Sequence, residues 1–421
     1  MKKKINYSII LLLSGLIFSN ASSAAEITLT YSEGKNRLLK ESLQVLAEYY
    51  HVNLAQTEVQ AARTWNNPLF VWNADMYSHE QNSYFHMGNQ TLVQVEYVIG
   101  VSGERIQAIR QANLGVEIAE LAFLDVVRGL VMEYSETYNR LYLLKEKSNV
   151  YDVILKRYDY LIASDNKRLE LGIISFNDLV RIKSELVSIQ TEATANRNEI
   201  LSEQQHLNTL LNLPAETVVI PEEPEFEFDD SLNSGQIITM AEEFRPDLKL
   251  AQKNISYYEQ SLKTEQAKGG PSINMGYQPR DRGSNYVRPY AGLVFEVTLP
   301  IFDRNQAGIQ TARIQIDQSK TNLEIFTNNL QNEVFSAYMQ YINNSENLAS
   351  YTPEFMTELT NLSAGAVENF EKKNITLLEF LDFQQIYLDS EMQYLEMKSN
   401  YLYSFNFLSF VVGKDLTIST N

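Results

Sequence analysis

The sequence predicts a mainly α-helical protein that is built from two copies of one unit and carries a small membrane β-barrel segment. An internal repeat at an almost constant offset predicts the two copies. In each copy, long amphipathic helical patterns enclose two short strand-like segments, which predicts helices combined with a small β-structure. Beyond the first 25 residues the chain has no apolar run of about eighteen residues, so any insertion into a membrane must use β-strands.

The repeat becomes visible when each residue is compared with the residue 200 positions later. Matching pairs at this offset include Glu96 with Glu296, Ile109 with Ile309, and Ala112 with Ala312. Further along the chain, Gly172-Ile173-Ile174-Ser175 matches Lys373-Asn374-Ile375-Thr376 at an offset of 201. An offset that stays almost constant over such a span indicates a tandem duplication.

Each copy contains a long helical pattern followed by a returning one. Apolar residues recur every three or four positions from Glu104 to about Leu171 without a proline, and a helix of that span would be ~100 Å long. In the second copy Pro353 stands where the first copy has Val153, and proline is expected to break or kink the helix. Returning helices are expected at about 176–211 and 377–411. Helices of such length are typical of coiled coils and helical barrels.

The N-terminus has the pattern of a signal peptide. Three lysines at positions 2–4 precede an apolar stretch of about ten residues, Ile9–Phe18, which is too short to span a bilayer. Small residues follow, and cleavage is expected after Ala24 or Ala25. The expected organisation is a signal peptide at 1–25, a first repeat at 26–213, an acidic, proline-containing connector at 214–240, a second repeat at 241–413 and a C-terminal tail at 414–421.

Each repeat carries one pair of candidate strands, each near the length that a tilted strand needs to cross a bilayer. The first pair is expected at about 69–77 and 89–100, and the second at about 272–278 and 286–300. Their residues alternate in polarity, and tyrosines gather at their ends, as in an aromatic girdle. A soluble antiparallel sheet with one wet face would produce the same alternation. If the strands enter a membrane, chains must associate, because open strand edges are not tolerated in lipid; three copies would supply twelve strands, an allowed barrel size.

The residue types exclude several classes of function. The chain has no cysteine and only four histidines, none of them four residues apart, so no metal site and no cofactor are expected. No nucleophile–base set or phosphate-binding loop is present in the sequence, which argues against an enzyme. The formal charge of −18 disfavours nucleic acid as a partner.

Several short motifs are similar to those of a known family. Arg245-Pro246-Asp247-Leu248 opens the second repeat, and Leu299-Pro300-Ile301-Phe302-Asp303 leads from a strand into a helix. Gly103-Glu104-Arg105 stands at the equivalent junction of the first repeat, and the stretch Leu171–Leu179 marks a helix-tip turn. In order and spacing these motifs resemble the outer-membrane efflux protein family, the TolC-like outer membrane factors. The sequence departs from the family at Lys373-Asn374, which replaces a glycine at the second tip, and at 303–306, which lacks a common glycine.

The resemblance implies a homotrimer with a twelve-stranded β-barrel in outer-membrane lipid and a long α-helical barrel that extends into the periplasm. It also implies a periplasmic adaptor protein and an inner-membrane pump as partners, and a role as a passive duct for efflux or secretion. The alternative that the residues leave open is a secreted helical-bundle structural or interaction protein of the periplasm, whose strands would form a soluble sheet.

By resemblance, the functional positions lie at the helix tips. Asp178, Glu379 and Asp382 fall where family members carry acidic or polar gate residues, and carboxylates that face the lumen of a trimer would form rings of charge. Acidic residues also favour the first turn of a helix because they complement its dipole, and that explanation stays open for all three. The turns themselves are the candidate adaptor contacts, through Gly172, Ile173, Ser175, Asn374, Ile375 and Thr376.

Overall fold

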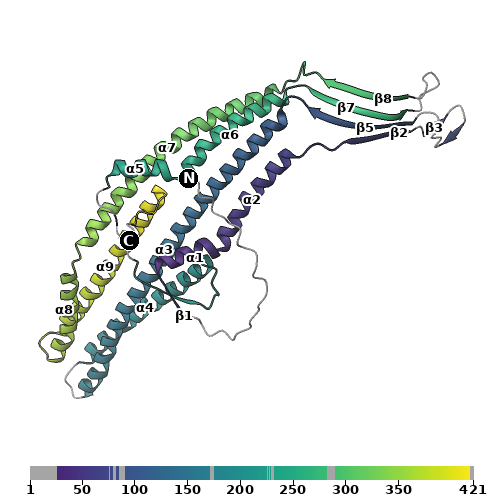
Figure 1. The fold of residues 1–421 in the computed structure, drawn as a ribbon. Helices are drawn as coiled ribbons and strands as arrows, with labels where there is room; N and C mark the ends of the chain where they lie inside the picture. Colours follow the sequence, from purple (N-terminus) through teal and green to yellow (C-terminus); the bar gives the residue numbers. More distant parts are fainter. Residues whose placement is uncertain are drawn as a thin grey trace.

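The chain forms an elongated molecule with a β-sheet at one end and two helical hairpins at the other (Figure 1). This computed structural model describes residues 26–74, 76–78, 82–84, 91–170, 175–224, 226, 228, 232–281 and 290–417. The predicted signal peptide, the tip residues Gly172 and Ile173, and the last four residues of the tail lie outside the described residues.

The two repeats follow the same order of helix, two strands, long helix and returning helix, as the sequence predicts. The first repeat comprises α1 (Tyr31–Glu41), α2 (Leu43–Arg63), β2 (Leu69–Ala74), β5 (Thr91–Gly100), α3 (Glu104–Glu170) and α4 (Phe176–Leu210), with the small hairpin β3 (Tyr77–Ser78) and β4 (Ser83–Tyr84) beyond β2. The second comprises α5 (Ser234–Phe244), α6 (Pro246–Lys268), β7 (Ser272–Asp281), β8 (Tyr290–Thr298), α7 (Gln306–Ala349), α8 (Pro353–Glu371) and α9 (Leu377–Val412). The predicted long helix is confirmed, since α3 runs through 67 residues.

The break that Pro353 predicts is present. The helix α7 ends at Ala349, and α8 begins at Pro353 itself. Thr352 caps the new helix, because its hydroxyl accepts a hydrogen bond from the Phe355 N–H at 3.2 Å. Proline suits a first helical position, where its missing N–H would have no partner in any case. The second repeat therefore has two shorter helices where the first repeat has a single one.

At both places where the sequence lacks an expected glycine, another residue adopts a left-handed backbone conformation. Lys373 takes the left-handed conformation, with φ of 61°, and the Asn374 N–H donates to the Asn369 carbonyl at 2.9 Å, which closes α8 as a glycine would. At the start of α7, Asn305 takes φ of 58°, while Gly103, just before α3, has φ of 77°. Asparagine adopts this conformation more readily than most residues, so the junction keeps its geometry without glycine.

A short parallel sheet ties the N-terminal segment to the connector, and the sequence analysis did not predict it. The strand β1 (Glu26–Leu29) pairs with β6 (Val218–Pro221), so that Ile27 lies opposite Val219. Tyr138 of α3 is fully buried beneath this sheet, and its hydroxyl donates to the carbonyls of Leu29 at 2.7 Å and Glu222 at 3.0 Å. The acidic connector is thus anchored to the middle of α3.

The helices and strands lie side by side in a curved layer, and among the described residues both of its lateral edges are free (Figure 1). The main sheet has the order β2-β5-β7-β8, all antiparallel. Below it α3 packs against α2, α4, α6 and α9, and α7 packs against α6 and α9. One edge is therefore formed by β2, α2 and α4, and the opposite edge by β8 and α7.

The motif that opens the second repeat holds the middle of the molecule together. Arg245 is buried, and its guanidinium donates to Asp247 at 3.0 and 2.7 Å, to Glu333 of α7 at 2.5 Å and to the Val411 carbonyl of α9 at 3.3 Å. Arg128 of α3 approaches the same Asp247 carboxylate at 2.9 Å. Four helices therefore meet at one network of charged side chains.

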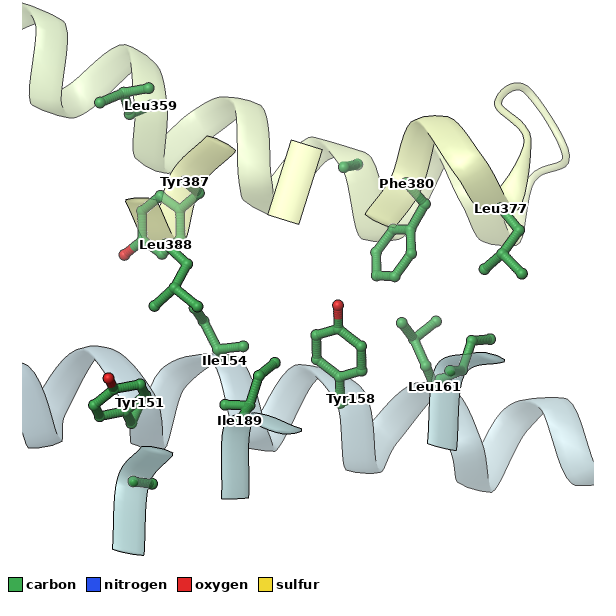
Figure 2. Close-up of a cluster of buried hydrophobic side chains, with 13 residues drawn as sticks. Tyr151, Ile154, Tyr158, Leu161, Ile189, Leu359, Leu377, Phe380, Tyr387 and Leu388 are labelled. Carbon is green, nitrogen blue, oxygen red and sulfur yellow. The ribbon is translucent and has the colours of Figure 1, made fainter. Parts of the chain in front are cut away.

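The lower hairpins pack through an apolar core that Figure 2 shows in close-up. Tyr158 of α3 and Phe380 of α9 face one another across this core, with ring centroids 6.1 Å apart. Phe380 is fully buried, and it also stacks on Phe370 of α8 at 5.1 Å. Leu161 and Ile182, likewise fully buried, bring α3 and α4 into the same core. The core therefore joins the α3–α4 hairpin to the α8–α9 hairpin.

Candidate functional site

One face of the main sheet is largely apolar over its paired residues, with Thr91 and Arg280 as the polar residues at one end of it. Cross-strand partners share a face, so the register fixes the composition of each side. These apolar side chains are Phe70, Trp72, Val93, Val95, Tyr97, Ile99, Ile273, Met275, Tyr277, Leu293, Phe295 and Val297. Many of them are open to solvent in the single chain: Leu293 is 82% exposed, Phe295 63% and Trp72 54%. A contiguous apolar surface of this kind is typical of a site that contacts a membrane or another protein.

The opposite face of the sheet carries a polar network. Gln278 Nε2 donates to Gln94 Oε1 at 2.7 Å, and the Gln94 amide donates in turn to Glu96. Asn274 Nδ2 lies 3.1 Å from a carboxylate oxygen of Glu96 and 3.2 Å from one of Glu296. These side chains come from β5, β7 and β8. The sheet is therefore amphipathic, with hydrogen-bonded amides and carboxylates on one side only.

At the first tip, the described residues show a helix cap. The Ser175 hydroxyl accepts a hydrogen bond from the Asp178 N–H at 3.1 Å and donates to the Asp178 carboxylate at 2.7 Å. At this N-terminus of α4, Ser175 is exposed and Asp178 is half-buried. The acid thereby complements the helix dipole, as the dipole explanation predicts.

At the second tip, Thr376 and Glu379 form a reciprocal capping box. The Thr376 N–H and hydroxyl donate to the Glu379 carboxylate at 2.7 and 2.9 Å, and the Glu379 N–H donates back to the hydroxyl at 3.3 Å. The hydrogen bond from the Thr376 backbone, followed by that from its hydroxyl, lowers the pKa of the Glu379 carboxyl below its ordinary value. The Asn374 side-chain amide donates to Asn369 at 3.1 Å, and Ile375 packs partly into the apolar core.

Asp382 lies one turn further along α9 and is exposed. Among the residues that the structure describes, no hydrogen bond or ion pair joins Asp178 to the acids of α9. The structure thus places the three candidate acids on the solvent-facing starts of two returning helices at one end of the molecule (Figure 1).

The structure also reveals a polar contact near the tips that the sequence analysis missed. Arg157 of α3 donates to the buried Ser363 hydroxyl of α8 and reaches Gln384 of α9 at 3.4 Å. Its guanidinium lies over the Tyr387 ring, 5.1 Å from the centroid, and burial lowers the pKa of the arginine. An arginine inside an otherwise apolar helical stripe was the only sequence signal for this contact.

The described part of the chain lacks two further features. Those residues contain no group of three or more histidine, cysteine, aspartate or glutamate side chains that could hold a metal ion. Within the same residues, no helix combines the length and the apolar character that crossing a bilayer requires.

Comparison with known proteins assigns the fold. No protein-family model and no curated protein sequence matches the chain. Among solved structures, it is similar to the Campylobacter jejuni CmeC outer membrane channel, with a TM-score of 0.71 and 14% identity over 93% of this chain and 87% of that one. The Vibrio cholerae outer membrane protein VceC gives 0.71 and 13% over 92% and 96%, and the open state of the Neisseria gonorrhoeae MtrE outer membrane channel gives 0.71 and 14% over 93% and 90%.

These similarities extend over almost the whole length of each chain. They show that the protein has the fold of the TolC-like outer-membrane channels, as its motifs predict. In this chain the fold combines two helical repeats with a sheet that is amphipathic across its two faces.

Proposed function

We propose that this protein is the outer-membrane channel of a tripartite efflux or secretion system, and that it conducts substrates passively to the cell exterior. The amphipathic sheet carries the proposal. A largely apolar, exposed face suits contact with lipid, and an opposite face with a polar network suits a water-filled lumen. The sheet would lie in the outer membrane, and the helices would extend into the periplasm.

The free edges of the layer support a homotrimer. The sheet ends on one side at β2 and on the other at β8, and unpaired strand edges are not tolerated in lipid. Three copies joined edge to edge would close twelve strands, with the β2 edge of one copy against the β8 edge of the next. Below the sheet, α4 presents Val180, Val187 and Leu201 at heptad spacing, and all three are exposed in the single chain. Such a stripe suits a neighbouring helix of a second copy.

The tips are the proposed contact with the rest of the transport machinery. The turns that include Gly172, Ile173, Ser175, Asn374, Ile375 and Thr376 would meet a periplasmic adaptor protein, which links the channel to an inner-membrane pump. The exposure of both helix starts supports this assignment. The absence of an enzymatic motif in the sequence fits a passive duct.

Asp178, Glu379 and Asp382 are proposed as charges at the periplasmic mouth. Capping contacts account for the positions of the first two, and an acid can cap a helix and still face a lumen. In a trimer each acid would be present three times, and such rings favour cations over anions. Capping and charge selection are therefore compatible roles for the same side chains.

Planar-bilayer recording tests both the channel function and the proposed role of the three acids in ion preference. The detergent-extracted protein is expected to form channels that prefer potassium over chloride. The variant Asp178→Asn, Glu379→Gln, Asp382→Asn should form channels with a weaker preference, because glutamine still supports the capping box while the charges are gone. Replacing Glu216, an exposed acid in the turn before β6, with glutamine is the control and should change little.

The outcomes separate the two parts of the proposal. A protein that forms no channels would contradict the function. Channels whose ion preference is unchanged by the triple substitution would show that these three acids do not select ions.

A further inference from the structure

The polar network of the sheet brings the carboxylates of Glu96 and Glu296 to the same asparagine side chain. The register places Glu296 opposite Asn274, and it places Glu96 opposite Gly276, two residues further along the same strand. Asn274 Nδ2 donates to Glu96 at 3.1 Å and to Glu296 at 3.2 Å. One amide therefore bridges carboxylates from the strands on either side of its own.

The surroundings of Glu96 are shaped for a carboxylate. Gly276 leaves the space beside it open: a Cβ atom there would lie 3.1 Å from Gln94 Nε2 and 3.4 Å from Glu96 Cγ. Gln94, which is only 5% exposed, uses its amide to donate to Glu96, while Gln278 donates to Gln94 at 2.7 Å. This chain of donors ends on Glu96.

The orientation of the Asn274 side chain also indicates that its surroundings suit ionised carboxylates. Its Nδ2 serves both carboxylates, while its Oδ1 atom is shielded from solvent and has no hydrogen-bond partner among the described residues. An amide that leaves its own acceptor unpaired to donate twice is oriented by the charges it faces. No lysine or arginine side chain among those that the structure describes forms an ion pair with either glutamate. The two negative charges are therefore not neutralised within the described sheet.

We infer that Glu96 and Glu296 form a cation-selecting ring inside the β-barrel segment, with Asn274 as the residue that positions them. The inference rests on the proposed function, because the ring requires three copies around one lumen. Each copy contributes two carboxylates, so the complete ring carries six. A ring of fixed negative charge concentrates cations and excludes anions in a narrow, water-filled passage.

This ring is separate from the acids at the helix tips. The sheet and the tips lie at opposite ends of the molecule (Figure 1), so the two charged regions would act in series along one passage. The strands lie far from the helical hairpins, so a change at the tips would leave the ring in place. Cation preference should therefore persist when the acids at the tips have been neutralised.

The test is the reversal potential of single channels in a potassium chloride gradient, measured for the wild-type protein and for E96Q/E296Q. Glutamine keeps an oxygen that accepts the Asn274 N–H, so the substitution removes charge with little change of shape. The permeability ratio of potassium to chloride is expected to fall at least about threefold, since rings of this kind create potentials of several kT. The control is Glu104→Gln, which removes an exposed carboxylate at the start of α3, outside the strands; it should leave the ratio close to wild type.

The outcomes distinguish this inference from the function on which it rests. If E96Q/E296Q channels keep the wild-type permeability ratio, the inference that Glu96 and Glu296 select cations is wrong. If the double variant forms no channels, the single variants E96Q and E296Q decide the matter: each should lower the ratio, and two unchanged ratios would overturn it equally. A wild-type protein without channel activity would instead contradict the proposed function itself. The variant Asp178→Asn, Glu379→Gln, Asp382→Asn should be measured in the same experiment. It keeps Glu96 and Glu296, so it should retain the cation preference that these two residues produce.

Discussion

Replacing Arg245 with methionine is expected to lower the free energy of unfolding by about 3 kcal/mol, one of the largest effects of any single substitution here. The side chain is buried and donates to Asp247, Glu333 and the Val411 carbonyl. Methionine fills much of the same volume, but it leaves Glu333 and the carbonyl without this donor. Chemical denaturation in detergent, followed by far-ultraviolet circular dichroism, measures the loss.

A matched control is Arg140→Met on α3. Arg140 pairs with Glu203 at 3.2 Å, but its side chain is 62% exposed, and exposed pairs contribute less than about 1 kcal/mol. Equal effects of the two substitutions would show that the buried network does not anchor the four helices.

The same network predicts a dependence on pH. Burial alone would raise the pKa of the Asp247 carboxyl, but hydrogen bonds from Arg245 and the charge of Arg128 hold it below its ordinary value. A folded-state pKa below the unfolded value means that this stabilisation is complete above the unfolded pKa of about 4 and is lost as the pH falls through the folded pKa. The difference in stability between wild type and Arg245→Met should therefore narrow as the pH falls below about 4.

Replacing Phe380 with alanine is expected to cost about 3–5 kcal/mol. The ring is fully buried between Phe370 and Tyr158, and its removal leaves a cavity in the core that joins the two lower hairpins. Denaturation should report the loss of stability, and amide hydrogen exchange should report faster opening of α8 and the start of α9.

Leu378→Ala serves as the comparison for Phe380. Leu378 is two residues away on the same helix but 65% exposed, so its truncation should change the stability little. A small effect at Phe380, similar to that at Leu378, would mean that the hairpins do not depend on this core for their contact.

The regular parts of the fold could be predicted from the sequence because they depend on local patterns. The spacing of apolar residues predicts α3 and its returning helix, and Pro353 predicts the end of α7. The alternation in the strands predicts the two faces of β5. Each of these signals lies within one element or follows from the repeat.

The features that sequence reasoning missed depend on partners far apart in the chain. The strands β1 and β6 have four residues each, and their partners stand 192 positions apart (Glu26 with Val218), so neither strand carries a readable pattern of its own. The bridge from Asn274 to Glu96 joins residues 178 positions apart, and it depends on the register between β5 and β7. At the tips, the capping of Asp178 and Glu379 agrees with the dipole argument, while their place in a lumen stays a prediction.

The most direct test of the central claim is the native mass of the protein after detergent extraction of the outer-membrane fraction. A trimeric channel should give a particle of three chains that appears in this fraction and requires detergent for its release. A monomer that is released without detergent into the periplasmic fraction would contradict it, because a single layer with two open edges cannot enclose a channel.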